Sequence, residues 1–307
     1  MSIVQQRTIK NTIHCRGVGL HSGLKTSLIL HPAAPDSGIL FRRTDASGGG
    51  AEIAATWRNA VESALCTTLS NGEGITIGTV EHLMAALAGA EIDNVLVELD
   101  GPEVPIMDGS AAPFVFLIEC AGVVEQDAPR QAIRILKTVT VGDEGKSACL
   151  MPDDGFSMSF EIDFASRAVS QQDLSIVFDS ETFKSEISRA RTFGFLHEVD
   201  RMRAAGLARG GSLDNAVVVS GDTILNEGGL RYADEFVRHK LLDSLGDLYL
   251  AGAPIIGHFR GLRSGHLLNR KLLEALFATP DAWCKTTLSR ADAVDSLMWR
   301  ERARASA

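Results

Sequence analysis

Apolar and polar residues alternate in the first part of the chain with the two-residue period that is typical of β-strands. This pattern predicts one strand over 5–19 and another over 24–33, joined by a glycine-rich turn. Two shorter strands, 64–70 and 74–80, are predicted to form a hairpin because the turn-forming residues Asn71–Gly74 lie between them. The chain therefore begins as a β-rich segment.

The pattern then changes to a helical period. Apolar residues three and four positions apart predict a helix over 79–90, with Thr79 as its N-cap and Gly89 as its C-cap. A strand over 94–100 follows, and then a second helix over 110–122. A sheet and two helices are thus expected in the first half.

The second half shows a similar order of patterns after a polar, proline-containing stretch at 125–130, where we place a domain boundary. Its predicted strands lie at 132–141, 147–152, 156–164, 214–220 and 254–261. Its predicted helices lie near 181–189, 198–205, 233–252 and 265–277. The second half is therefore also expected to combine a sheet with helices.

The patterns together predict an α+β fold of two similar domains, each a β-sheet layered on a pair of α-helices. The domains are expected at 1–126 and 127–280, with a C-terminal extension over 281–307. Self-similarity between the halves is too weak to define a sequence repeat.

Composition narrows the classes of function. The 307 residues carry a net charge of −9, which disfavours nucleic-acid binding because phosphate neutralisation needs clustered cations. The five cysteines are scattered and form no CxxC pair, so neither a disulfide framework nor a cysteine zinc site is expected. The N-terminus lacks a signal-peptide core, and no apolar run of membrane-spanning length occurs, so a cytoplasmic protein is expected.

The predicted helix over 233–252 contains His239 and Asp243, which lie four residues apart and so share one face. Imidazole and carboxylate are both good zinc ligands. A simple ion pair within the helix explains the same spacing, and pairs of this kind are common. Spacing alone leaves both interpretations open.

Glu81 and His82 lie in the first turn of the helix predicted over 79–90. The negative charge of Glu81 at this end interacts favourably with the helix dipole, and His82 fits a capping or core position. Alternatively His82 is a metal ligand and Glu81 a neighbouring base, the combination that HExxH helices use. Two histidines, one aspartate and an open position would make a catalytic rather than a structural zinc site.

Two further residues have both a structural and a catalytic interpretation. His266 opens the last predicted helix and could serve as a general acid; the helix N-terminus would lower its pKa, whereas a carboxylate such as Asp247 would raise it. Thr192 could donate a hydrogen bond to an oxyanion, in a segment whose Phe193 could equally belong to the core.

Several stretches occur in one order that strongly resembles the UDP-3-O-acyl-N-acetylglucosamine deacetylase family, over about residues 3–278. These stretches are GVGLHSG, ALCTTLS, TVEHLMAALAG, IDNVLVELDGPEVPIMDGSAAPF, RARTFGF, LARGGSLDNAVVV, DEFVRHKLLDSLGDLYL and SGHLLN. The resemblance implies a zinc amidase that cleaves the acetamide of UDP-3-O-(3-hydroxyacyl)-N-acetylglucosamine at the committed step of lipid A biosynthesis. It also implies two domains with the metal in the cleft between them.

The resemblance implies a role for each matching residue. The zinc ligands would be His82, His239 and Asp243. The catalytic residues would be Glu81 as the general base, His266 as the general acid, Asp247 as its carboxylate partner and Thr192 as the oxyanion donor.

Substrate contacts are implied in the same way. Positions matching the substrate site and an acyl-chain passage in a small insert are Lys240, Phe193, Leu65, Cys66, Leu196, Val199, Ala208, Gly211, Ala216 and Val218. Most of them are apolar, as a fatty chain requires. We interpret Cys66 as a thiol that lines the cleft, and we assign no metal to His21, His197 or His258.

The expected partner is therefore a small amphiphilic UDP-sugar, met by a monomer near the inner membrane surface without insertion. Iron(II) also accepts two histidines and an aspartate, so the residues leave Zn²⁺ and Fe²⁺ open. The alternatives are a zinc hydrolase acting on another N-acyl sugar, or a non-catalytic zinc-binding protein. The segment after about residue 278 matches nothing recognisable, and we expect its end to act as a turnover signal.

Overall fold

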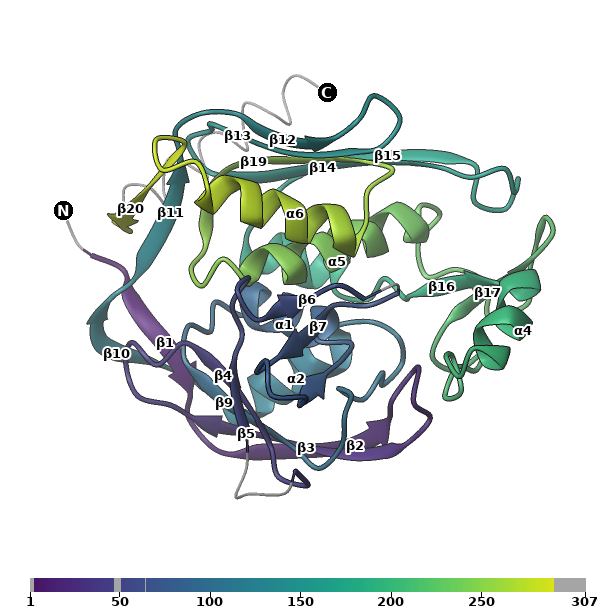
Figure 1. Ribbon diagram of the computed structural model, residues 1–307, viewed down its shortest axis with the longest axis horizontal. Coiled ribbons are helices and arrows are strands. Elements are labelled where there is room, and N and C mark those ends of the chain that lie inside the picture. Colours follow the sequence, from purple (N-terminus) through teal and green to yellow (C-terminus); the bar gives the residue numbers. More distant parts are fainter. Residues whose placement is uncertain (1–2, 47–50, 64, 290–307) are drawn as a thin grey trace.

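The computed structural model describes residues 3–46, 51–63 and 65–289. Two large sheets form the outer layers of the molecule, and two pairs of helices lie between them (Figure 1). This arrangement is the predicted α+β fold, with one sheet and one helix pair contributed by each half of the chain. No helix among the described residues is long and apolar enough to cross a membrane.

The first sheet has five strands and packs on two helices of the first half. Its strands, in spatial order, are β2 (Ile13–Val18), β3 (Lys25–Pro32), β9 (Val95–Leu99), β4 (Ile39–Arg43) and β5 (Ala51–Ala54). The helices are α1 (Glu81–Gly89) and α2 (Ala112–Ala121). Between them and the sheet lie buried side chains such as Leu28, Phe41 and Phe114.

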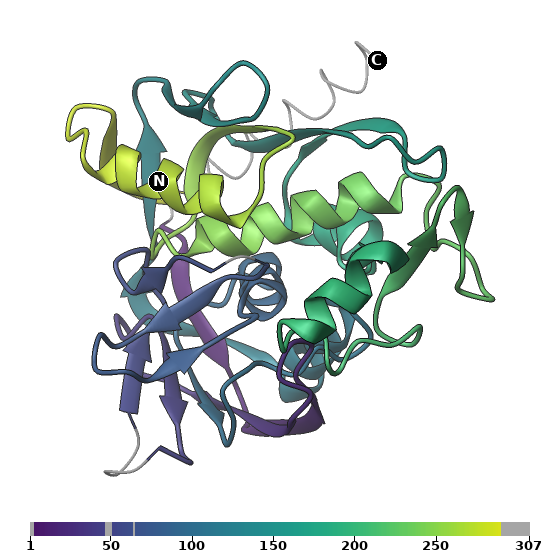
Figure 2. The same ribbon diagram turned by 45° about the vertical axis from the view of Figure 1, so that its right-hand side comes forward.

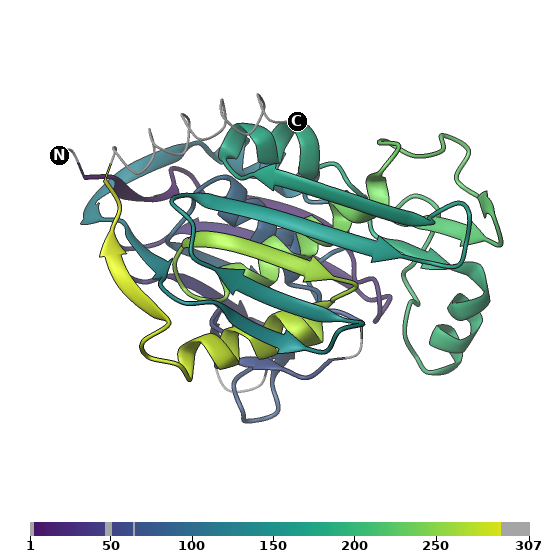
Figure 3. The same cartoon turned by 90° about the horizontal axis from the view of Figure 1, so that it is seen from above.

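The second sheet has seven strands and packs on the two longest helices (Figure 3). One path through it runs β12 (Val139–Gly142), β13 (Ser147–Met151), β19 (Ile255–Leu262), β11 (Gln131–Ile135) and β20 (Trp283–Thr287). Its other strands are β14 (Phe156–Asp163), which also pairs with β19, and β15 (Gln171–Val177). The helices are α5 (Glu235–Tyr249) and α6 (His266–Phe277).

Smaller elements complete the fold. A two-stranded sheet joins β1 (Gln5–Ile9) to β10 (Val123–Pro129), and a three-stranded sheet contains β6 (Ala60–Val61), β7 (Thr68–Ser70) and β8 (Thr76–Ile77). A projecting lobe, which we call the insert, contains β16 (Phe193–Phe195), α4 (Leu196–Ala204), β17 (Val217–Ser220) and β18 (Thr223–Ile224) (Figure 2). The short helix α3 (Ser180–Thr182) continues into a π-helical turn, η1 (Phe183–Ile187).

Tertiary contacts correct several local predictions. The strand predicted over 5–19 is broken into β1 and β2, because the N–H groups of Lys10 and Asn11 turn away to donate to the carbonyls of Gly122 and Ala121 at the end of α2. The strand predicted over 132–141 likewise divides into β11 and β12. The boundary placed at 125–130 falls largely within β10, and the segment from residue 281 contributes β20 to the second sheet.

The predicted caps of α1 are also wrong. Thr79 has a φ of 57° and its hydroxyl donates to Glu103, so Val80 occupies the N-cap position without a side-chain cap. Gly89 is the last helical residue rather than the cap. A Cβ at this position would lie 2.0 Å from the ring of Phe183, so the packing requires glycine. Close packing, rather than capping, explains this glycine.

Helices α1 and α5 make an extensive contact between the two halves of the described chain. A Cβ on Gly246 of α5 would lie only 2.0 Å from the carbonyl oxygen of Glu81, at the first residue of α1. The two backbones therefore touch at this point, and glycine is the residue that permits it. This crossing brings the polar face of α5 beside Glu81 and His82.

We predict that Gly246→Ala destabilises the protein, although alanine favours an isolated helix by about 1 kcal/mol. The added methyl group has no room, and overpacking of this kind costs about 1–3 kcal/mol. Urea unfolding measures the change, and Gly228→Ala is the control because a Cβ at that position meets nothing within 4 Å. An unchanged or higher stability of Gly246→Ala would contradict the close crossing.

Candidate metal centre and active site

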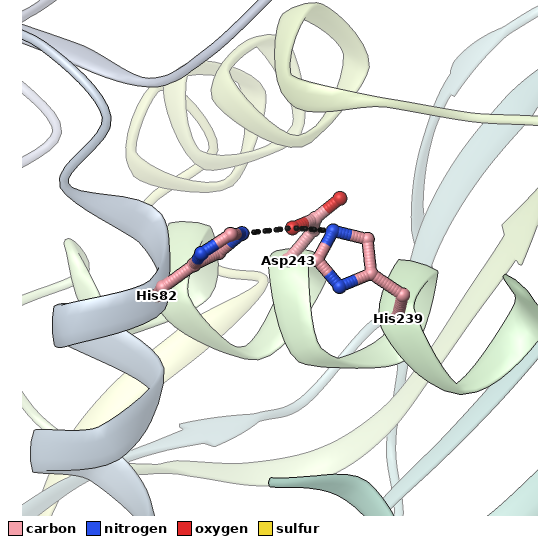
Figure 4. A group of neighbouring side chains, drawn as sticks. All are labelled: His82, His239 and Asp243. Atoms are coloured by element: carbon pink, nitrogen blue, oxygen red, sulfur yellow. Dashed lines mark ion pairs between the residues drawn. The ribbon is translucent and has the colours of Figure 1, made fainter. Parts of the chain in front are cut away.

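Three buried side chains from two helices converge at the crossing (Figure 4). His82 comes from α1, and His239 and Asp243 lie one turn apart on α5. The Oδ1 atom of Asp243 lies 3.5 Å from Nε2 of His82 and 3.3 Å from Nε2 of His239. Candidate ligand atoms of all three residues lie within 4.8 Å of one another, as a single metal ion requires.

The hydrogen bonds around this cluster fit a bound cation. His239 donates from Nδ1 to the carbonyl of Ala190 at 3.1 Å, which leaves a lone pair on Nε2 facing Asp243. Asp243 Oδ1 is buried and makes no hydrogen bond to any described residue. A buried carboxylate oxygen without a donor is costly, and a divalent ion would satisfy it. Two imidazoles and one carboxylate are donors that both zinc and iron(II) accept.

The protonation states suit metal ligation. Burial lowers the pKa of His239 to about 3, so its imidazole is neutral near pH 7. Burial raises the pKa of Asp243, but its charged neighbours, Lys240 among them, lower it by more and hold it well below its usual range. Lys240 donates to the second oxygen of Asp243 at 2.8 Å and keeps a raised pKa, because this carboxylate outweighs the effect of burial.

Glu81 lies beside the cluster at the start of α1. Its Oε2 accepts a hydrogen bond of 3.0 Å from the backbone N–H of Thr67. Burial is the main cause that raises the pKa of Glu81 to about 7. A carboxylate with this pKa can both accept and release a proton near neutral pH.

His266 faces the cluster from the other side, at the start of α6. Its Nδ1 donates to Asp247 at 2.8 Å, and its Nε2 lies 3.8 Å from Oε1 of Glu81 and 3.9 Å from Oδ2 of Asp243. Burial lowers the pKa of His266, but Asp247 and Glu81 raise it by more, to about 10. The sequence left the direction of this shift open; in the structure the carboxylates outweigh burial, and the imidazole is protonated near pH 7.

Two residues that sequence reasoning missed hold Asp247 in place. The hydroxyl of Thr67 donates to Asp247 at 2.5 Å, and Asn269 donates to it from Nδ2 at 2.8 Å. Both belong to stretches that the resemblance used, LCTT and SGHLLN, and Asn269 lies one helical turn after His266. That spacing could have indicated Asn269, whereas the contact of Thr67 depends on the tertiary fold.

A groove of about 360 Å³, which we call the insert groove, opens beside the cluster. Among its lining residues are Leu65, Thr192, Phe193, Leu196, Val199, Ala208, Gly211, Ala216 and Val218. The structure thus gathers nine of the predicted catalytic and substrate-site residues in one apolar channel. The ring of Phe193 connects the groove to the candidate metal ligands. It packs edge-on against the ring of His239 at a centroid distance of 6.3 Å and lies 6.0 Å from Nζ of Lys240.

Cys66 lies apart from the insert groove. It is buried beside a small cavity of about 20 Å³ that is lined also by Thr67, Asp247 and His266. Its Sγ lies 3.5 Å from the hydroxyl of Ser63. The thiol therefore borders the site through this cavity, and it is not among the residues that line the insert groove, where a contact with the acyl chain was expected.

Glu103 positions both the start of α1 and the turn before β3. This buried carboxylate accepts from the hydroxyl of Thr79 at 2.8 Å and from the backbone N–H groups of His21 and Ser22 at 2.9 and 2.8 Å. Its sequence context gave no sign of this role, since its partners lie far away along the chain. His21 borders the insert groove, but neither it nor His197 nor His258 joins a metal-binding group among the described residues.

The chain is similar in sequence to known proteins over most of its length. Residues 6–278 match the family model for UDP-3-O-acyl N-acetylglycosamine deacetylase. Proteins named UDP-3-O-acyl-N-acetylglucosamine deacetylase are 53% identical in Chromohalobacter salexigens and 54% identical in Pseudomonas entomophila, each over 92% of this chain and 93% of the relative. One from Phenylobacterium zucineum is 51% identical over 91% of this chain and 95% of the relative. The chain therefore belongs to the UDP-3-O-acyl N-acetylglycosamine deacetylase family, as its ordered motifs predict.

Proposed function

We propose that this chain is a metal-dependent amide hydrolase of lipid A biosynthesis. It removes the acetyl group of UDP-3-O-(3-hydroxyacyl)-N-acetylglucosamine and releases acetate and UDP-3-O-(3-hydroxyacyl)-glucosamine. The convergence of Glu81, His266 and the cluster of His82, His239 and Asp243 on one small volume carries the proposal. Membership of the family supports the substrate class.

The metal would be held by His82, His239 and Asp243, and Zn²⁺ is the ion that we propose, with Fe²⁺ as the alternative that fits the same donors. When bound, such an ion supplies Lewis acidity: it polarises a carbonyl oxygen and lowers the pKa of water.

The chain's own residues would then move the protons. Glu81, with a pKa of about 7, accepts a proton from the attacking water. His266, held in its protonated form by Asp247, donates a proton to the departing sugar nitrogen. The hydroxyl of Thr192 donates a hydrogen bond to the oxyanion that forms at the acetamide carbonyl.

The amphiphilic substrate matches two features beside this chemistry. The insert groove is mostly apolar and takes the acyl chain, and Phe193 lies between the groove and the candidate metal ligands. Lys240 contributes positive charge toward the diphosphate even though the chain is acidic overall. Since the substrate joins a nucleotide to a fatty chain, we propose that a monomer acts in the cytoplasm close to the inner membrane surface.

The acyl chain should contribute strongly to catalysis. Each buried methylene group is worth about 0.8 kcal/mol, so a substrate without the chain should lose at least about 10²-fold in kcat/KM. Ala216→Phe narrows the insert groove and should raise KM for the acylated substrate alone. Ala278→Phe is the control, because residue 278 is exposed and is not among the residues that line the groove. Equal rates on UDP-N-acetylglucosamine with and without the acyl chain would favour a hydrolase for another N-acyl sugar.

Removal of the metal tests the ligand set. A chelator should abolish deacetylation and added Zn²⁺ should restore it, while metal analysis of His239→Ala and Asp243→Ala should show little bound ion. His258→Ala is the matched control, because His258 lies on the second sheet between the hydroxyls of Ser157 and Ser159. Undiminished metal in His239→Ala would refute the assignment.

The general base can be tested without disturbing the metal. Glu81→Gln keeps the size of the side chain and should lower kcat by about 10²–10⁴-fold while the bound metal remains. Glu161→Gln on β14 is the control and should leave the rate unchanged. If Glu81→Gln with bound metal retained full activity, Glu81 would not be the base.

A further inference from the structure

A second apolar groove, of about 410 Å³, lies at the C-terminal ends of α1 and α5. Ala88 comes from the first half of the chain, whereas Phe156, Phe178, Leu248 and Ile256 come from the second. We call it the terminal groove, because Val4, Leu288 and Ser289 also line it. It shares no lining residue with the insert groove, and the proposed reaction gives it no role.

The chain is fixed where it reaches this groove. The N–H of Leu288 donates to the carbonyl of Arg130 at 2.9 Å, and the carbonyl of Leu288 accepts from the N–H of Val4 at 3.0 Å. Ser289 forms a bridge with Ile3. Ser289, the last residue that the structure describes, therefore lies at the rim of the groove, and residues 290–307 follow it in the sequence.

The sequence of this segment is suited to an apolar surface. Ala291, Val294, Leu297 and Met298 recur at the spacing of one helix face, and Trp299 follows them. In helical form, a segment of this length would span roughly 27 Å.

Charge at the rim complements the end of the segment. Asp154 and Glu181 line the groove, are exposed, and have no ion-pair partner among the described residues. Residues 300–304 contain three arginines and one glutamate. The arginine at the groove, Arg130, is already committed to Asp93 and Glu91.

We propose that residues 290–307 dock in the terminal groove of the same chain, with their apolar face on its apolar lining and their arginines toward Asp154 and Glu181. The docked segment would cover side chains from both halves and so hold α1 against the second sheet. This inference does not depend on the proposed activity.

Tryptic cleavage of the full-length protein tests the docking, because Arg290, Arg300, Arg302 and Arg304 are cleavage sites within the segment. The wild-type segment should be cut at least about tenfold more slowly than a free peptide of the same sequence, since cleavage follows the undocked population. Leu297→Asp combined with Met298→Asp should bring the rate close to that of the peptide. The control Ser296→Asp lies away from the apolar face and should keep the slow rate.

A second pair of changes tests the groove side without touching its buried residues. Asp154→Asn combined with Glu181→Gln should speed cleavage several-fold in low salt and less in high salt. The slow rate should be the same after tenfold dilution of the protein. Cleavage of the wild-type segment at the rate of the peptide would overturn the proposal. So would slow cleavage of the Leu297/Met298 variant, or protection lost on dilution, which would indicate a second copy as the occupant.

Discussion

The contact between Gly246 of α5 and the backbone of Glu81 is the constraint on which the site depends. Neither half carries a complete set of groups: His82 and Glu81 come from α1, whereas His239, Asp243 and Asp247 come from α5. Only when the helices touch do imidazole and carboxylate atoms from both approach within the span of one metal ion. The two sheets and their apolar cores fix these helices, so fold and site are specified by the same packing.

The charges of the site follow from burial. Glu81, Asp243 and Asp247 are all buried, and three carboxylates in so small a volume require compensating cations. Lys240 and protonated His266 supply two of these cations. Oδ1 of Asp243, which has no hydrogen-bond partner among the described residues, is suited to contact a metal ion as the third. Burial also raises the pKa of Glu81 toward neutrality, so one environment supports a proton acceptor beside a proton donor. These separated proton affinities are what amide hydrolysis near pH 7 needs.

Local pattern predicted much of the fold, because helix α5 and strands such as β9 and β14 are strongly periodic. Local pattern failed where contacts between distant parts of the chain determine the structure. Examples are the break between β1 and β2, the positive φ of Thr79 and the packing role of Gly89. The site shows the same division. Helical spacing paired His239 with Asp243, but joining them to His82 required the ordered family motifs. The supporting hydrogen bonds of Thr67 and Glu103 are made to residues far away along the chain, so no local spacing indicates them.

X-ray absorption at the zinc edge of the metal-loaded protein tests whether residues from two helices at one crossing supply the ligands. We expect nitrogen and oxygen neighbours at about 2.0–2.2 Å, two of them imidazoles, and no sulfur shell. The histidine signal should also fall by half in His82→Ala, which removes the ligand from α1 alone. A sulfur neighbour at about 2.3 Å, from a thiol such as Cys66, or an unchanged spectrum in His82→Ala would show that the ligands lie elsewhere.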